Sequence, residues 1–198
     1  MSTSIRVVPL SAALVPAWDD LFVRASCPCH CRYWHFEGTK NDWLARCADA
    51  PEKNAEEQAE LVRSSAPEAG GLVALDPNDP ARVVGWMKLA PRPPKLRGLP
   101  VSRALALDGG PGVLVVGCIL VDPAHRKRGV TRALIAAAPA HARSVGAHTI
   151  EAYPRIADHR LSDEEAWMGP MHAFEAAGFT PAHDDAIPAY PVLRLRVI

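Results

Sequence analysis

The 198-residue chain has no excess of charge of one sign and no long apolar run, and its first residues do not resemble a secretory signal. Its 22 basic and 22 acidic residues balance, which argues against a protein built to coat nucleic acid or an anionic membrane. Residues 1–16 have no uninterrupted apolar core of the kind that a secretory signal needs. The best apolar run, residues 113–122, ends in an acid and is far shorter than the roughly 20 residues of a membrane-spanning helix. We therefore expect a soluble, cytoplasmic protein with neither nucleic acid nor membrane as a partner.

The chain also lacks the even number of cysteines that is typical of a secreted disulfide framework. Its five cysteines include an alternating set, Cys27, Cys29 and Cys31. A zinc site completed by Cys47 or His35 is an alternative interpretation. Structural zinc sites normally leave two or more residues between ligands, so the Cys-x-Cys-x-Cys spacing argues against one. We expect reduced thiols and no metal.

Internal repeats and low-complexity tracts are absent as well, and the length suits one domain, residues 1–198, with a core of its own. The proline-rich stretch 91–111 predicts a long surface loop at the rim of a site, and Pro139 is expected to kink the helix that contains it. Hydrophobic periodicity and turn residues predict strands at residues 5–9, 72–75, 82–89, 113–121, 148–153, 179–182 and 192–197, and helices at residues 12–25, 42–47, 55–64, 131–145 and 171–177.

One segment, GCILVDPAHRKRGVTRAL at residues 117–134, predicts an anion-binding turn. The strand before it is apolar and largely β-branched, as expected of a strand covered on both faces. Arg126, Lys127 and Arg128 follow, and Gly129 precedes a helix whose first backbone N–H groups would point back at the turn. Residues 124–132 carry four Arg or Lys residues and no acid, which concentrates positive charge where a diphosphate would bind. A solvated basic loop is the alternative.

Residues 126–131, RKRGVT, resemble the Arg/Gln-x-x-Gly-x-Gly/Ala acyl-CoA motif of the GNAT N-acetyltransferases, although Thr131 stands where the family prefers Gly or Ala. Residues 171–179, MHAFEAAGF, resemble the second motif of that family, a helix ending in Gly-Phe. Two motifs in the family's order are more specific than either alone. The chain also resembles a GNAT subgroup with a Cys/Trp-rich N-terminal segment, a Gly-Trp strand like residues 85–86 and a Glu-Ala-Tyr-Pro sequence like residues 151–154.

This resemblance implies an α+β (mixed α/β) fold, in which a mixed six- to seven-stranded sheet carries helices on both faces. In that fold the strands at residues 113–121 and 148–153 are parallel neighbours that splay apart. The resemblance also implies acetyl-CoA as co-substrate, with its pantetheine arm bound by the backbone of Ile119, Leu120 and Val121. Its pyrophosphate would be held by the amides of Arg126, Lys127, Arg128, Gly129, Val130 and Thr131.

Acyl transfer from a thioester to an amine needs a neutral nucleophile, a polarised carbonyl and a proton for the leaving thiolate. Many GNAT enzymes take that proton from a tyrosine, but Phe174 stands at the corresponding position here. Tyr153 is our candidate acid, with a tyrosine that only packs at the end of the sheet as the alternative. Glu151 lies two residues earlier and therefore on the same strand face. It is our candidate base, with a salt bridge to an arginine as the alternative.

Tyr33, Trp34 and Trp86 are candidates for the walls of an acceptor pocket, because aromatic walls suit a small amine or a cation. Large core residues are the alternative, above all for Trp86. We therefore predict an N-acetyltransferase that moves an acetyl group from acetyl-CoA to a primary amine of a small molecule or peptide. A non-catalytic acyl-CoA-binding or thiol- or metal-sensing module on the same fold is the alternative. The sequence leaves open whether the chain forms a homodimer.

Overall fold

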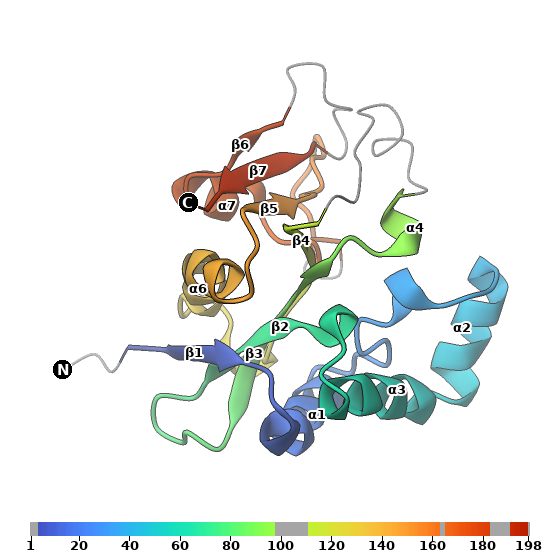
Figure 1. Ribbon diagram of the computed structural model, residues 1–198. Coiled ribbons are helices and arrows are strands. Elements are labelled where there is room, and N and C mark those ends of the chain that lie inside the picture. Colours follow the sequence, from blue (N-terminus) through green and yellow to red (C-terminus); the bar gives the residue numbers. More distant parts are fainter. Residues whose placement is uncertain (1–3, 98–110, 163–164, 183–190, 198) are drawn as a thin grey trace.

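The computed structural model describes residues 4–97, 111–162, 165–182 and 191–197. Within these ranges, seven strands form one sheet in the order β1-β2-β3-β4-β5-β7-β6 (Figure 1). The strands are β1 (Arg6–Pro9), β2 (Gly71–Leu75), β3 (Val83–Pro91), β4 (Val113–Val121), β5 (Thr149–Ala152), β6 (Thr180–Pro181) and β7 (Leu193–Arg196). Only β4 and β5 run parallel, and the other neighbours are antiparallel. The predicted mixed sheet is confirmed.

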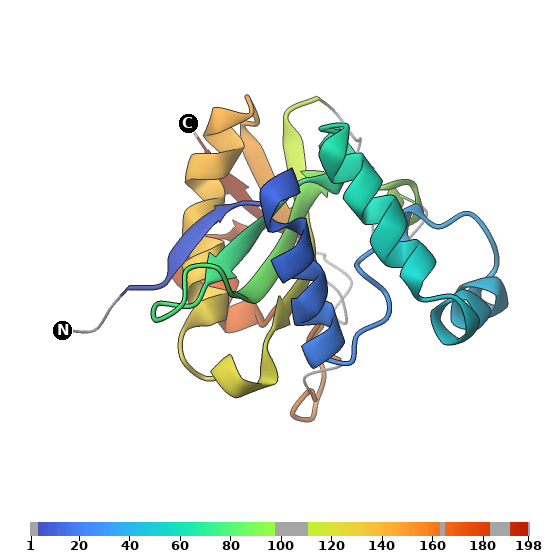
Figure 2. The same ribbon diagram turned by 90° about the horizontal axis from the view of Figure 1, so that it is seen from below.

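Helices cover both faces of this sheet (Figures 1 and 2). Helices α6 and α7 pack on one face, and α1, with α3 beside it, packs on the other. The helices are α1 (Val15–Arg24), α2 (Lys40–Asp49), α3 (Glu52–Arg63), α4 (Pro94–Arg97), α6 (Val130–Ser144) and α7 (Met171–Ala176). Single 3-10 turns are η1 (Ala12–Leu14), η2 (Tyr33–His35), η3 (Pro67–Ala69) and η4 (Pro123–His125). No helix in the described ranges is long and apolar enough to cross a membrane.

Local sequence accounts for where several of these elements begin and end. Helix α2 begins with a capping box, in which the side chains of Thr39 and Asp42 each accept a hydrogen bond from the other residue's backbone N–H. The predicted helix 12–25 is split, because its first three residues form η1 and α1 begins only at Val15. Helix α6 continues through Pro139 to Ser144, close to the predicted end.

Residues 91–97 differ from the surface loop predicted for the stretch 91–111. Pro91 is the last residue of β3, and α4 follows shortly after it. A proline at the start of a helix loses no intrahelical hydrogen bond, so Pro94 favours this turn of helix. Leu96 is fully buried and anchors α4 to the molecule. The rest of the predicted loop, residues 98–110, lies outside the described residues.

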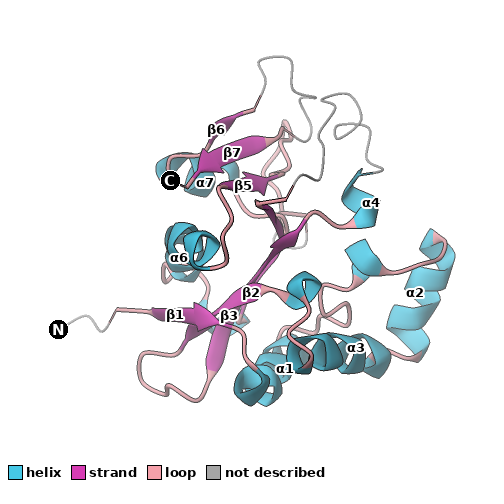
Figure 3. Cartoon of the chain, in the orientation of Figure 1, coloured by secondary structure: helices cyan, strands magenta, loops and turns pink. Residues whose placement is uncertain are grey.

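The core consists of three clusters, two of which follow the two faces of the sheet. The cluster under α6 and α7 includes Leu134, Ile135 and Phe174, and the one under α1 includes Trp18 and Trp86. The third, smaller cluster lies where β4 and β5 end their pairing, and it comprises Trp34, Leu96, Val115, Tyr153, Met168 and Val192. Figure 3 shows the loops and short elements that surround this region.

Candidate active site

Strands β4 and β5 are neighbours along only part of their length. Their last parallel pair is Val115 with Glu151. Strand β4 then continues to Val121, whereas β5 ends at Ala152, so the two strands separate as expected. In the ladder with β3, Gly117 is an extra residue on β4, which makes a β-bulge at the start of the separated half.

A pocket of about 410 Å³ opens beside the separated half of β4. One side is formed by the end of β4, the turn after it and the start of α6, and the other by α7 and the residues before it. Of the nine residues predicted to bind the cofactor, it contains eight: Ile119, Leu120, Val121, Arg126, Lys127, Gly129, Val130 and Thr131. Arg128 belongs to the same turn and is exposed, but it does not line the pocket.

The predicted pantetheine-binding strand has a backbone amide that is already hydrogen-bonded outside the sheet. The amide of Ile119 donates a hydrogen bond of 2.7 Å to the carbonyl of Trp167. An arm that binds the Ile119 amide must therefore displace this carbonyl or bind beside it. Gly169 follows closely, with φ at +92°, and an added Cβ there would lie 2.7 Å from the ring of Phe174. This segment packs tightly between β4 and α7.

The basic turn leads directly into α6. Gly129 is the N-cap of the helix and has a left-handed φ of +84°, a conformation that glycine adopts without steric strain. The first N–H groups of a helix have no intrahelical partner, and the helix dipole adds positive potential there. Gly85 on β3 allows α6 to begin this close to the sheet, because a Cβ at that position would lie 2.4 Å from Cγ1 of Val130. The geometry suits a phosphate group.

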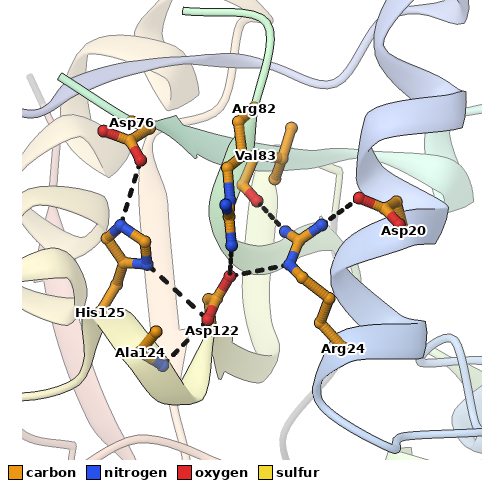
Figure 4. A network of polar contacts seen from close by, with 8 residues as sticks. All are labelled: Asp20, Arg24, Asp76, Arg82, Val83, Asp122, Ala124 and His125. Atoms are coloured by element: carbon orange, nitrogen blue, oxygen red, sulfur yellow. Dashed lines mark hydrogen bonds and ion pairs between the residues drawn. The ribbon is translucent and has the colours of Figure 1, made fainter. Parts of the chain in front are cut away.

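Asp122, at the end of β4, fixes the turn to the rest of the molecule (Figure 4). Its carboxylate accepts hydrogen bonds from Nε of Arg24 at 2.8 Å, from Nη2 of Arg82 at 3.1 Å and from the backbone of Ala124 at 2.9 Å. His125 approaches the same carboxylate at 3.7 Å. Burial alone would raise the pKa of Asp122, but the bonds from Arg24, Ala124 and Arg82 outweigh burial and lower it to about 2. The charged carboxylate thereby connects α1, the β2–β3 hairpin and the turn.

The candidate catalytic residues Glu151 and Tyr153 are both buried and in contact. The Tyr153 hydroxyl donates to Oε2 of Glu151 at 2.8 Å. The guanidinium of Arg92 donates to the same oxygen, and Nε of Arg194 donates to Oε1 at 2.8 Å. The salt bridge that the sequence left open is therefore present, with two arginines. Burial, together with the Glu151 charge, raises the pKa of Tyr153, so its hydroxyl keeps its proton at neutral pH.

The three aromatic residues predicted for the acceptor pocket occupy different surroundings. Trp34 lies with its ring 5.2 Å from that of Tyr33 and 5.4 Å from that of Trp167. Tyr33 is half-buried and Trp34 is buried, both beside the separated strands. Trp86 is fully buried, and its indole N–H donates to Sγ of Cys31 at 3.3 Å. The structure therefore brings Tyr33 and Trp34 together and leaves Trp86 in the core under α1.

The cysteine-rich segment forms a strained turn that is held by packing. All five cysteines are free thiols, and the sulfurs of Cys27 and Cys29 are 3.4 Å apart. Ser26, His30 and Cys31 have left-handed φ values of 51°, 43° and 55°, which non-glycine residues rarely adopt. In the described ranges, no group of three or more His, Cys, Asp or Glu side chains is arranged to hold a metal ion. This turn leads into η2, which lies beside the separated strands.

Sequence comparison agrees with this geometry. Residues 34–162 match the model of the acetyltransferase (GNAT) family. The chain belongs to the GNAT family. No curated protein is similar enough in sequence to count as a match.

Solved structures share the GNAT fold at low sequence identity. The PaiA N-acetyltransferase from Thermoplasma acidophilum, in complex with coenzyme A, superposes with a TM-score of 0.56 at 9% identity, covering 98% of this chain and 99% of that one. The yncA protein from Salmonella typhimurium, with its cofactor acetyl-CoA, gives 0.57 at 14% identity and covers 98% and 94%. The ribosomal-protein-S18-alanine N-acetyltransferase from Escherichia coli gives 0.51 at 13% identity and covers 98% and 94%. At these identities the likeness establishes the fold alone.

Two parts of this GNAT site were missed in the sequence. The wall opposite the basic turn includes Ala166, Gly169, Pro170, His172, Ala173 and Ala176. The motif at residues 171–179 gave a signal for this wall, but it was used only to identify the family. Asp122 was interpreted as a strand end, although an acid between an apolar strand and a proline often accepts backbone N–H groups of the following turn. Its two arginine partners, 98 and 40 residues away in sequence, gave no local signal.

Proposed function

We propose that this GNAT protein transfers an acetyl group from acetyl-CoA to a primary amine of a small molecule or peptide. The observation that carries the proposal is the pocket beside the separated half of β4, with the basic turn and the start of α6 along one side. The pantetheine arm would lie along Ile119, Leu120 and Val121, and the diphosphate would bind at residues 126–131. The PaiA structure contains coenzyme A and the yncA structure contains acetyl-CoA, which supports this choice of donor.

In the proposed reaction the amine nitrogen attacks the thioester carbonyl carbon, a C–N bond forms and the C–S bond breaks. The amine loses one proton and the thiolate of CoA gains one. Tyr153 is the proposed acid, since its hydroxyl stays protonated and its ring lies in the cluster where β4 and β5 end their pairing, although neither Tyr153 nor Glu151 lines the donor pocket. For Glu151 to act as the base, one of its hydrogen bonds from Arg92, Arg194 or Tyr153 would have to open. We therefore propose that Glu151 also positions the Tyr153 hydroxyl.

Calorimetric titration with acetyl-CoA tests the donor site. The wild type should bind saturably, and Lys127→Glu, which places an acid on the pocket wall, should bind at least about tenfold more weakly. Arg143→Glu is the matched control, because it makes the same charge change on an exposed residue in the last turn of α6. An absence of binding by the wild type, or equal binding by all three proteins, would refute the proposed donor site.

Turnover distinguishes the enzyme from the alternative, a non-catalytic acyl-CoA-binding or thiol-sensing module. The contact between the sulfurs of Cys27 and Cys29 is the observation behind that alternative, although this contact and burial raise the pKa of the Cys27 thiol and make it less reactive. A panel of primary amines should be incubated with acetyl-CoA, and acetylated products should be detected by mass spectrometry, since the five protein thiols would react with reagents that detect free CoA. Saturable binding without any acetylated product would support the module. We place either activity in the cytoplasm, where free thiols are the rule.

A further inference from the structure

Lys88 is a buried lysine on the same strand face as Trp86, the face of the sheet that packs against α1. Lys88 on β3 is only 2% exposed, and its ammonium donates to the carbonyl of Glu68 at 2.7 Å. In the described part of the chain, no carboxylate lies within ion-pair distance of it. Burial lowers the pKa of Lys88 to about 8, so the amine is largely charged at neutral pH. A buried charge with a single neutral partner is unfavourable unless something else compensates for it.

Two more buried donors without a partner belong to the same neighbourhood. Among the residues that the structure describes, Nη1 of Arg32 and Nε2 of His35 are both buried and make no hydrogen bond, and Nε2 is a donor in the imidazole tautomer that carries its proton there. His35 lies near enough to both cations that, after burial, the charges of Lys88 and Arg32 lower its pKa, to about 3. Buried polar groups in native proteins are nearly always hydrogen-bonded, so three incompletely satisfied donors in one place point to a ligand. The other ionisable groups that act on Lys88 are Cys31, Cys118 and Glu68.

The position of this cluster relates it to the proposed reaction. The side chain of Lys88 passes over the bulge on β4, where an added Cβ on Gly117 would lie 3.5 Å from Cδ of Lys88 and 3.6 Å from Cδ1 of Trp34. Strand pairing also places Lys88 opposite Cys118. The cluster therefore borders the point at which β4 separates from β5. The basic turn at residues 126–131 lies beyond the other end of this separated half, so the two cationic regions are distinct.

The charge of the cluster decides which anion it suits. Arg32 has a partial partner in Glu57, whose Oε2 is 3.4 Å from Nε of Arg32. Lys88 has no acidic partner in the part of the chain that the structure describes, so about one positive charge is left over. A carboxylate carries a single negative charge and offers two oxygens with about four lone pairs, enough for all three donors. A phosphate group would bring close to two negative charges at neutral pH.

We propose that Lys88, Arg32 and His35 bind a carboxylate group of the acceptor, which makes the acceptor an amine that also carries a carboxylate, such as an amino acid. The inference rests on the proposed acetyl transfer. The cluster fixes one end of the acceptor, and the amine at the other end reaches the thioester beside β4. Lys88 is then a specificity-determining residue, and the chemical step itself does not need it.

Matched pairs of acceptors test the proposal. The probes are L-amino acids and their amides, which differ only in the carboxylate, and the readout is the kinetics of product formation by mass spectrometry. The acids should have kcat/KM values about ten- to a hundredfold above those of the amides, since a charge-assisted bond is worth about 1.5–3 kcal/mol. In Lys88→Met the KM for the acid should rise toward that for the amide, so that the ratio of the two kcat/KM values falls toward one. Lys53→Met, an exposed lysine on α3, should retain the preference.

A binding measurement keeps the proposal testable if turnover is slow. N-acetylated amino acids, the expected products, should bind the wild type in calorimetric titrations, and their amides and Lys88→Met should give no heat. Equal binding or turnover of acids and amides by the wild type would overturn the proposal, and so would a Lys88→Met variant that still discriminates. Failure of the proposed function has a different result, because acetyl-CoA would then not bind while N-acetylated amino acids still did.

Discussion

The indole N–H of Trp34 donates a hydrogen bond of 2.9 Å to the carbonyl of Gly117, the extra residue of the β4 bulge. This bond joins η2 to the strand at the point where β4 separates from β5. A bulge leaves backbone groups outside the regular ladder, and a buried carbonyl without a partner is unfavourable. Trp34 therefore stabilises the point where the strands separate, in addition to packing against the rings of Tyr33 and Trp167.

Replacing Trp34 tests this relationship. Trp34→Phe keeps an aromatic ring but leaves the Gly117 carbonyl unpaired, and should lower the free energy of unfolding by about 1–3 kcal/mol. The measurement is urea denaturation at neutral pH. Trp43→Phe is the control, because the indole N–H of Trp43 makes no hydrogen bond within the described residues. Equal losses in both variants would show that ring size, and not the bond, determines the effect.

The close approach of α6 to the sheet gives a second prediction. Gly85→Ala places a methyl group 2.4 Å from Cγ1 of Val130 and should displace the start of α6, with a loss of stability of about 1–3 kcal/mol. Acetyl-CoA binding should weaken as well, because the basic turn at residues 126–131 leads directly into that helix. Adding Val130→Ala removes the obstructing methyl group and should recover part of both losses. A double variant no better than the single one would contradict this explanation.

Asp122 makes stability depend on acid pH. Because its pKa is lowered to about 2 in the folded protein from an ordinary 3.8, its contribution of about 2 kcal/mol is complete above about pH 4 and disappears as the pH falls through 2. Asp122→Asn should therefore be less stable than the wild type at pH 7, and the difference should shrink between pH 4 and pH 2. The check is denaturant unfolding of both proteins across this range. A difference that is independent of pH would mean that packing, not charge, is responsible.

Substitutions of Glu151 and Tyr153 should have different effects on the stability of the fold and on kcat. Glu151→Gln removes the negative charge that pairs with buried Arg92 and should destabilise the fold by about 3–5 kcal/mol. Tyr153→Phe leaves those ion pairs intact, so its stability should stay within about 1.5 kcal/mol of the wild type. Its kcat should nevertheless fall by about a hundredfold if the hydroxyl protonates the thiolate. An unchanged kcat in a folded Tyr153→Phe protein would exclude Tyr153 as the acid.

The buried charge of Lys88 should lower the free energy of unfolding. Its pKa falls from an ordinary 10.5 to about 8 on folding, which corresponds to an unfavourable term of about 3 kcal/mol for burying the ammonium. Lys88→Met has a similar shape without the charge and loses one hydrogen bond worth about 1 kcal/mol. The variant should therefore be more stable than the wild type by about 2 kcal/mol at pH 7 in thermal or urea unfolding. A clear loss of stability would indicate that the ammonium supports the fold.

Much of the fold could be predicted because its signals are local. The apolar β-branched run of β4, the basic turn and Gly129 follow one another within 17 residues, at positions 113–129, and their order alone predicts a strand, an anion turn and a helix. The two strands of the β2–β3 hairpin were predicted from periodicity and turn residues in the same way. The stretch 91–97 was misjudged because prolines were interpreted only as loop formers, although a proline also suits the first turn of a helix.

The site was harder to predict because its contacts join residues far apart in sequence. Glu151 stood out as an acid in an apolar strand, but its partners Arg92 and Arg194 are 59 and 43 residues away. Trp86 is aromatic like Trp34, and only the register of β3 against its neighbours places it in the core. Lys88 is two residues from Trp86 on the same strand, and no local pattern distinguishes a buried lysine from an exposed one. The cofactor-binding roles stay predictions until a ligand is measured.

The two faces of the site come from different parts of the gene. Residues between 119 and 132 and between 166 and 176 line the pocket proposed for the donor, whereas the aromatic and basic groups proposed for the acceptor come from residues 32–35 and 88. Under the proposed assignment, mutations in residues 32–35 can alter which amine is accepted while the donor site stays unchanged. Descendants of one ancestor should diverge fastest around residues 26–48 and stay alike around residues 113–134, a pattern that would let a single acetyl donor serve many acceptors.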